Sequence, residues 1–222
     1  MNNYKEKFII FMAQAGALTF GDFTTKSGRK TPYFINTGKY CRGNDIQQLG
    51  SFYADCLMEH VKKINDIVLF GPAYKGIPLA TAAAVALAGR GFNVNYCFNR
   101  KEAKDHGEGG ALVGHPLKTG DRVLIIEDVI TAGTAVREVL PLIQATGAAV
   151  EGLVISVDRM ERGTGELSAV QEVKRDFGFE VFPIVTVRDI IACLHNRNVD
   201  GTVYIDDGMK TRMEDYMGEY CV

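Results

Sequence analysis

The sequence has no apolar run long enough to cross a membrane. Nothing in its 222 residues approaches the roughly 20 consecutive apolar residues of a membrane-spanning helix. The first residues, MNNYKEKFIIFMAQAG, hold a short apolar patch among charged and amide side chains. This pattern predicts an amphipathic helix and not a signal peptide. We therefore expect no membrane partner.

A large net charge is also lacking. The formal net charge is −2, which creates no global field to attract nucleic acid or an anionic membrane surface. Internal repeats and low-complexity linkers are absent. Because 46% of the residues are hydrophobic and the length suits one domain with a real core, we expect a single globular domain over residues 1–222.

Paired cysteines are missing as well. The five cysteines are scattered, odd in number and never spaced as CxxC: Cys41, Cys56, Cys97, Cys193 and Cys221. This usage argues against a disulfide framework or a zinc site, and it fits the reducing cytoplasm.

Strand-like and helix-like patterns alternate between residues 67 and 195. Strands are expected at 67–70, 94–98, 123–126, 153–157 and 181–185, and helices at 77–88, 135–145, 167–177 and 187–195. This β-α repetition predicts an α/β fold with a central, mostly parallel sheet covered by helices on both faces. Ligands of such sheets bind at the carboxyl ends of the strands, so the loops there should converge on one site.

The first 65 residues follow a different pattern. A helix is expected at 5–15, a hairpin with flanking aromatic residues within 20–35, and a helix at about 45–63. We expect this region to form a small cap over the sheet edge and not an independent domain. The last residues, 206–222, indicate a docking helix with no chemistry of their own.

The stretch VLIIEDVITAGTA at 123–135 is the most informative one. A turn of small residues between a strand and a helix leaves several backbone N–H groups free at the helix N-terminus, which suits a phosphate monoester. The carboxylates of Glu127 and Asp128 would repel a phosphate, so they should face sugar hydroxyls, a metal or both. The plain alternative is a strand-turn-helix junction with solvated charges. No GKS or GKT follows, and GxGxxG is absent.

Three further stretches carry charge at expected loops. NRKEAKDHGEGG at 99–110 combines four potential cations with glycines, as in a mobile lid that meets a leaving pyrophosphate. GPAYKG at 71–76 places Lys75 in a strand-to-helix turn, and KSGRKTPYF at 26–34 lies in the expected hairpin. A solvated loop, a surface lysine and a plain hairpin are the respective alternatives.

Together these stretches, with EDVITAGTA and DRMERG at 158–163, resemble the bacterial-type orotate phosphoribosyltransferases, which are type I phosphoribosyltransferases. The resemblance covers essentially the whole chain. It implies the reaction of orotate with 5-phosphoribosyl 1-pyrophosphate (PRPP) to give orotidine 5′-monophosphate and pyrophosphate, in pyrimidine biosynthesis. It also implies Mg²⁺ held through substrate oxygens with no dedicated protein ligands. A homodimer is implied too, in which the lid at about 102–114 acts on the neighbouring subunit's site.

The resemblance assigns functions to individual residues. PRPP binding falls to Lys26, Tyr74, Lys75, Arg100, Lys101, Lys104, His106, Glu127, Asp128, Val129, Ile130, Thr131, Ala132, Gly133, Thr134 and Ala135. Orotate binding falls to Phe34, Ile35, Thr131 and Arg159. Catalytic roles fall to Lys101, Lys104, His106 and Asp128. For Arg159 the plain alternative is a surface arginine at a strand end.

Two departures from the family pattern are visible. Glu127 stands where many members have aspartate, which keeps the charge on a longer arm. Ile35 stands where bacterial members commonly have phenylalanine, which changes one wall of the pyrimidine pocket. The competing hypotheses are a phosphoribosyltransferase for another base, which would lack this cap and lid, and a PRPP-sensing regulator. The regulator would need a nucleic-acid-binding unit, for which there is no obvious helix-turn-helix.

Overall fold

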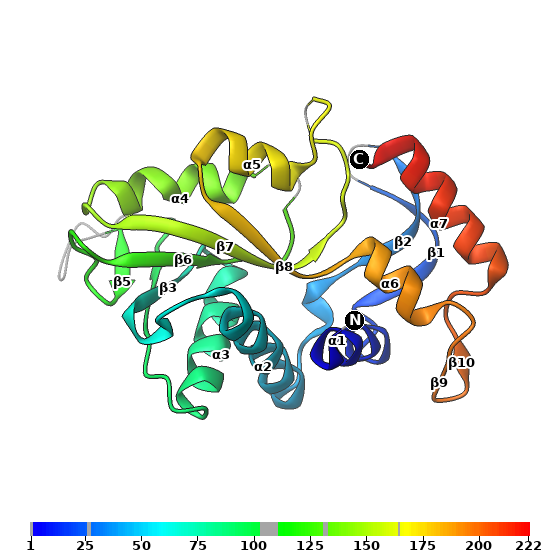
Figure 1. Cartoon of the computed structure of the whole chain (residues 1–222), viewed down its shortest axis with the longest axis horizontal. Helices are drawn as coiled ribbons and strands as arrows, with labels where there is room; N and C mark the ends of the chain where they lie inside the picture. Colours follow the sequence, from blue (N-terminus) through cyan, green and yellow to red (C-terminus); the bar gives the residue numbers. More distant parts are fainter. Residues whose placement is uncertain (1, 26–27, 103–110, 131–132, 164) are drawn as a thin grey trace.

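The computed structural model describes residues 2–25, 28–102, 111–130, 133–163 and 165–222. The main sheet has the strand order β5-β4-β3-β6-β7-β8. Its strands are β3 (Ile67–Gly71), β4 (Asn95–Asn99), β5 (Leu112–Gly114), β6 (Arg122–Ile126), β7 (Ala149–Asp158) and β8 (Glu180–Thr186). All neighbouring pairs are parallel except β4 and β5. The predicted α/β fold with a mostly parallel sheet is confirmed (Figure 1).

Helices cover both faces of this sheet. Figure 1 shows α2 (Gly43–His60) and α3 (Gly76–Ala88) on one face, and α4 (Thr134–Gln144) and α5 (Ala169–Phe177) on the other. The buried parts of the central strands are mainly apolar on both sides because alternate residues pack into two hydrophobic clusters. In β6, Leu124 and Ile126 pack into one hydrophobic cluster, while Val123 and Ile125 pack into the cluster on the opposite face.

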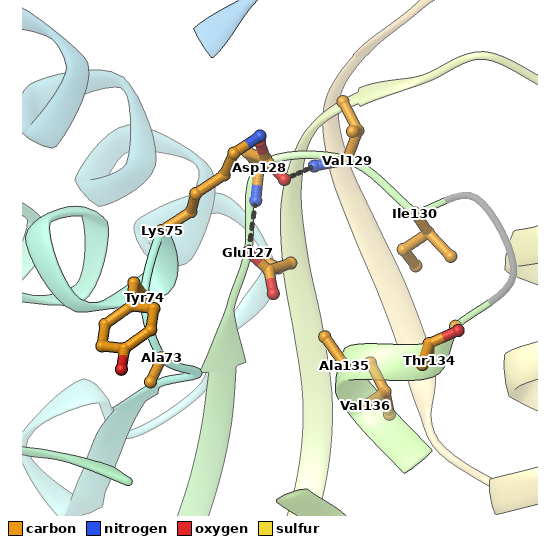
Figure 2. A pocket seen from close by; sticks show the side chains of 11 residues that line it. Ala73, Tyr74, Lys75, Glu127, Asp128, Val129, Ile130, Thr134, Ala135 and Val136 are labelled. Atoms are coloured by element: carbon orange, nitrogen blue, oxygen red, sulfur yellow. Dashed lines mark hydrogen bonds and ion pairs between the residues drawn. The ribbon is translucent and has the colours of Figure 1, made fainter. Parts of the chain in front are cut away.

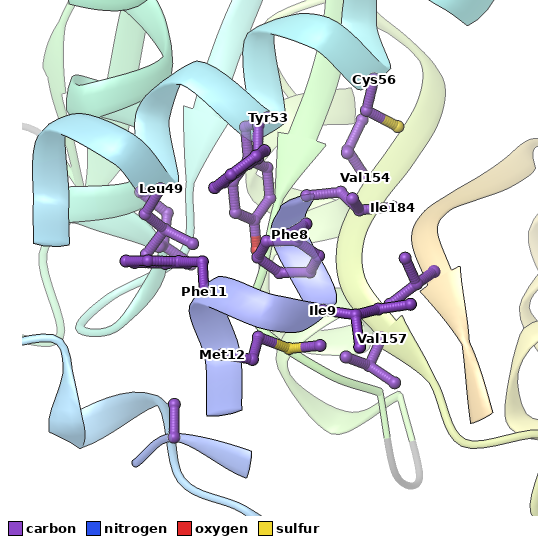
Figure 3. Packing of buried hydrophobic residues seen from close by; sticks show 14 of the residues in the cluster. Phe8, Ile9, Phe11, Met12, Leu49, Tyr53, Cys56, Val154, Val157 and Ile184 are labelled. Atoms are coloured by element: carbon purple, nitrogen blue, oxygen red, sulfur yellow. The ribbon is translucent and has the colours of Figure 1, made fainter. Parts of the chain in front are cut away.

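The N-terminal helix is part of the larger core. Helix α1 (Asn3–Gln14) buries Phe8, Ile9 and Met12 completely. Figure 3 shows these side chains beside Val157 of β7 and Ile184 of β8. The expected amphipathic helix is therefore held by apolar packing against the sheet and against α2.

A second group of elements lies beside the sheet. Strands β1 (Leu18–Thr24) and β2 (Lys30–Ile35) form the expected antiparallel hairpin. After β8 the chain forms α6 (Val187–Leu194), the short strands β9 (Asn198–Val199) and β10 (Thr202–Val203), and α7 (Asp207–Tyr220). Helix α7 packs on β2, so the C-terminal helix contacts the N-terminal hairpin (Figure 1). Single turns of 3-10 helix occur at Thr37–Lys39 and Ile64–Asp66.

Several boundaries differ from the expected ones for local reasons. Helix α2 begins at Gly43, two residues before Asp45, because the Asp45 carboxylate accepts from the backbone N–H of Arg42 in a capping box. Helix α5 begins after Ser168, whose side chain caps the N–H of Gln171. Strands β5, β9 and β10 were not expected. Within the described ranges, no helix combines the length and apolar character that crossing a membrane requires.

Candidate active site

A cavity of about 340 Å³ opens at the carboxyl ends of β3 and β6. From β3 the chain passes through α3 to β4 on one side, and from β6 it passes through α4 to β7 on the other. Such a reversal of strand order leaves a crevice where ligands of parallel sheets bind. Its walls in Figure 2 are Ala73, Tyr74, Lys75, Glu127, Asp128, Val129, Ile130, Gly133, Thr134, Ala135 and Val136.

The acidic pair at the end of β6 has a firmly held backbone. The N–H of Glu127 donates to the Val154 carbonyl at 3.0 Å and so extends the ladder with β7. The buried hydroxyl of Tyr53 donates to the Glu127 carbonyl at 2.6 Å. Ser156 donates its N–H and its hydroxyl to the Asp128 carbonyl, at 2.8 and 2.6 Å. Both carboxylates are therefore presented from a fixed main chain.

The carboxylate of Asp128 is buried and has three donors. Its Oδ2 accepts from Nζ of Lys75 at 2.9 Å and from Oγ1 of Thr37 at 2.7 Å. Its Oδ1 accepts from the N–H of Val129 at 2.7 Å (Figure 2). One cationic and two polar donors therefore hold this carboxylate in a fixed position.

The carboxylate of Glu127 is buried as well but accepts fewer hydrogen bonds than that of Asp128. Its Oε1 accepts from the N–H of Asp128 at 3.2 Å. Burial, followed by the nearby charge of Asp128, raises the pKa of Glu127 from 4.5 to about 7. Glu127 thus keeps its proton to a higher pH than an ordinary carboxyl group does.

The opposite wall is the start of α4. Gly133 is the N-cap residue and has a φ of 66°, in the left-handed region that favours glycine. A Cβ at this position would meet no atom closer than Cγ2 of Val173 at 3.6 Å, so the backbone conformation, and not a lack of space, calls for glycine. The exposed Thr134 follows at the first helical position. The free N–H groups of such a helix start attract anions.

The third wall is the turn between β3 and α3. Its Ala73–Tyr74 peptide bond is cis. The N–H of Ala73 donates to Oδ1 of Asn99 at 2.8 Å, which ties this turn to the end of β4. Tyr74 is 67% exposed, and Nζ of Lys101 lies 5.7 Å from the centre of its ring. Lys75 and Lys101 thus bring positive charge to this side of the cavity.

Other predicted residues lie away from this cavity. Phe34 is 37% exposed and stacks on Phe23 of the hairpin. Ile35 packs against the larger core. Arg159 lies just past the end of β7, over the ring of Tyr33. The backbone N–H of Arg100, just before the expected lid, donates to the carbonyl of Ala111 within it.

Five predicted residues cannot be placed. Lys26, Lys104, His106, Thr131 and Ala132 lie outside the described residues. Their predicted functions stay predictions.

Four residues of the site escaped the sequence reasoning: Thr37, Tyr53, Ala73 and Asn99. A threonine in an exposed turn and a tyrosine in a helix carry no local signal for contact with a strand end far along the chain. Ala73 belongs to GPAYKG and Asn99 to NRKEAKDHGEGG, two stretches already linked to the site. The signal that could have identified Asn99 is its position as a polar residue at the end of a strand.

Residues 44–199 match the phosphoribosyl transferase domain. An orotate phosphoribosyltransferase of Clostridium acetobutylicum is 51% identical over 224 residues, which cover 100% of both chains. One from Cronobacter sakazakii is 55% identical over 87% of this chain and 90% of its own. The crystal structure of the Francisella tularensis orotate phosphoribosyltransferase has a TM-score of 0.84 and 33% identity, and the match covers 97% of this chain and 100% of that one.

Proposed function

The chain belongs to the orotate phosphoribosyltransferase family, and on this basis we propose how its residues transfer the phosphoribosyl group of PRPP to N1 of orotate. In this reaction the bond from C1 of the ribose to pyrophosphate breaks as the bond to N1 forms. The protein's task is to position the reactants and to stabilise charge. The observation that carries the proposal is that an acidic pair, a helix N-terminus and lysines line one cavity.

We assign the ribose to Asp128 and Glu127. Carboxylates accept hydrogen bonds from the 2- and 3-hydroxyls, and their charge stabilises the positive charge that develops on the ring. Asp128 suits this function because its three donors hold the carboxylate in a fixed position. The 5-phosphate belongs at the start of α4, where Gly133, Thr134 and Ala135 expose backbone N–H groups, together with Val129, Ile130, Thr131 and Ala132.

The leaving pyrophosphate belongs on the wall formed by the turn between β3 and α3. Tyr74, Lys75 and Lys101 line or approach this side of the cavity. Family resemblance adds Lys26, Arg100, Lys104 and His106. By analogy, the arginine finger of phosphoryl-transfer enzymes, which stabilises charge in the transition state, is worth about 10³–10⁵ in rate.

The residues of the cavity determine how a magnesium ion could be held there. Among the described residues no three His, Cys, Asp or Glu side chains are grouped to hold a metal ion. This fits an ion held through oxygens of the substrate and not by a dedicated set of protein ligands, as Mg²⁺ commonly is at sites that bind substrate phosphates. When bound, Mg²⁺ would neutralise charge on the pyrophosphate, while Glu127 and Asp128 would hold the ribose hydroxyls.

Orotate belongs with Arg159, Phe34, Ile35 and Thr131. The guanidinium of Arg159 suits the carboxylate and carbonyl oxygens of the base, and an exposed aromatic ring such as Phe34 suits its face.

The family resemblance also supports a homodimer in which the lid of one subunit serves the site of the other.

Substitution of Asp128 tests this assignment. Asp128→Asn removes the charge beside the developing cation, so kcat should fall by about 100-fold, with a smaller effect on orotate binding. Glu151→Gln, an exposed acid on β7, is the matched control and should keep full activity. Activity is followed as loss of orotate absorbance with PRPP and Mg²⁺, and adenine replaces orotate in a second arm. An Asp128→Asn, Glu127→Gln double variant with near wild-type turnover would refute the assignment.

A further inference from the structure

The guanidinium of Arg159 is held on two sides. Its carbon lies 4.7 Å from the centre of the Tyr33 ring, within reach of a cation-π contact. Nε and Nη2 both donate to Oε1 of Glu161, at 2.8 and 2.5 Å. The side chain is only 11% exposed. An arginine at a strand end is usually solvated and mobile, and this one is fixed.

Glu161 is itself fixed by the C-terminal helix. The hydroxyl of Tyr216, on α7, donates to the same Oε1 at 2.6 Å. Nη1 of Arg29 lies 3.7 Å from the other oxygen. The ring of Tyr216 meets that of Tyr33 edge-on, at 5.9 Å between ring centres. Arg159, Glu161, Tyr216 and Tyr33 therefore form one contiguous unit, which we call the arginine clamp.

The backbone around the clamp turns sharply to make these contacts possible. Met160 has a φ of 58°, and its N–H donates to Oδ1 of Asp158 at 2.7 Å. This turn brings Glu161 back beside Arg159. Beyond it, Arg162 donates to the Tyr220 carbonyl, and Val222 donates to the Met160 carbonyl at 3.1 Å. The end of α7 thus pairs with the segment that carries the clamp.

The clamp leaves one edge of the guanidinium available. Within the described residues, the hydrogen bonds of Arg159 use Nε and Nη2, and Nη1 has no protein acceptor. A free arginine side chain loses considerable rotamer freedom when a ligand fixes it. A pre-organised one loses little, so it binds a planar anion more tightly.

We propose that Glu161 and Tyr216 are positioning residues that hold Arg159 in the orientation in which it receives the carboxylate or a carbonyl oxygen of the pyrimidine base. The inference rests on the proposed function of Arg159. It gives α7, in which no chemistry was recognised from the sequence, a part in base recognition. Among the described residues, no hydrogen bond, ion pair or ring contact joins the clamp to a residue that lines the PRPP cavity, so we expect its effect to be confined to the base.

The test compares Glu161→Gln and Tyr216→Phe with two controls on the same side of the molecule, Glu214→Gln and Tyr204→Phe. The KM for orotate should rise about tenfold in Glu161→Gln and severalfold in Tyr216→Phe, as expected when a charge-assisted or a neutral hydrogen bond is lost. The KM for PRPP should stay within twofold of wild type. Calorimetric titration of orotidine monophosphate should weaken in parallel, and both controls should match wild type.

Two further measurements separate positioning from plain stabilisation. The melting temperature reports loss of packing, and a structural role alone would lower it without a selective change in orotate KM. In an Arg159→Ala background, Glu161→Gln should have no additional effect on orotate KM. If Arg159→Ala raises orotate KM but neither clamp variant does, the inference is wrong. If Arg159→Ala itself leaves orotate KM unchanged, the assigned function of Arg159 is wrong instead.

Discussion

At the scale of single residues, the contrast between Glu127 and Asp128 stands out. The two carboxyl groups are adjacent in sequence and both buried, yet Asp128 has three donors and Glu127 has one. Burial and the nearby charge of Asp128 raise the pKa of Glu127 to about 7. The two adjacent acids of the family pattern therefore have different surroundings.

This contrast predicts a specific pH dependence of stability. The pKa of Glu127 is about 7 in the folded chain and 4.5 ordinarily, so the folded chain keeps a proton that the unfolded chain has released between these pH values. Stability contributed by the protonated group is therefore lost as pH rises from about 4.5 to about 7. The difference amounts to at most about 3 kcal/mol.

Glu127→Gln should remove this dependence. The free energy of unfolding, measured by urea denaturation from pH 4.5 to 8, should fall less with pH in the variant than in wild type. At pH 8 the variant should be the more stable protein by about 1–3 kcal/mol. Glu166→Gln, an exposed control, should track wild type. Parallel curves for Glu127→Gln and wild type would contradict the raised pKa.

At the scale of elements, the start of α4 depends on one backbone conformation. Gly133→Val places a β-branched residue at a φ of 66°, at a cost of about 1–2 kcal/mol or a shift of the helix start. Either response displaces the N–H groups assigned to the phosphate. We expect the KM for PRPP to rise more than tenfold while the fold is retained.

The matched control for this variant is Gly178→Val. Gly178 ends α5 with a φ of 76° and has no atom within 4 Å of an added Cβ, so it carries similar strain away from the cavity. Circular dichroism and melting temperature should change alike in both variants, and PRPP kinetics should change only at Gly133. Equal PRPP kinetics in the two variants would contradict the proposal that the 5-phosphate binds at this loop.

The order of helices and strands could be predicted because each element depends on the pattern of its own stretch of sequence. The run before Glu127, the small-residue turn and the apolar pattern of α4 are neighbours in sequence, and each element follows from its own periodicity. The short edge strand β5 has only three residues and no pattern of its own. It pairs because β4 offers a free edge, which is a tertiary property.

The donors around the acidic pair could not be predicted for the same physical reason. Thr37 reaches Asp128 across 91 residues of chain, and Tyr53 reaches Glu127 across 74. The arginine clamp likewise joins Glu161 to Tyr216 across 55 residues. Sequence reasoning pointed to Lys75 among the donors of Asp128, whereas Thr37 and Tyr53 are brought to the acidic pair only by the fold.

At the scale of the whole molecule, the proposed homodimer predicts complementation between two inactive variants. Lys104→Ala should lose the lid lysine, and Asp128→Asn should lose the ribose site. If the lid serves the partner, a mixed dimer has one competent site. Random subunit exchange makes half of the dimers mixed, so activity should rise toward about a quarter of wild type.

The control for this experiment mixes Asp128→Asn with a Lys104→Ala, Asp128→Asn double variant, which can form no competent site. Exchange is verified by mass spectrometry of differently tagged subunits. Activity that stays at the sum of the parents, despite verified exchange, would mean that Lys104 serves its own subunit or is not needed.

The exposed ring of Tyr74 also offers a way to watch the cavity. The chain contains no tryptophan, so Tyr74→Trp would introduce a single indole, with the ammonium group of Lys101 near its face. Pyrophosphate that draws Lys101 away would change the surroundings of this one fluorophore. Its emission should shift on addition of pyrophosphate with Mg²⁺ and stay constant with orotate alone. The protein would thus report occupancy of one wall of its cavity optically, without turnover.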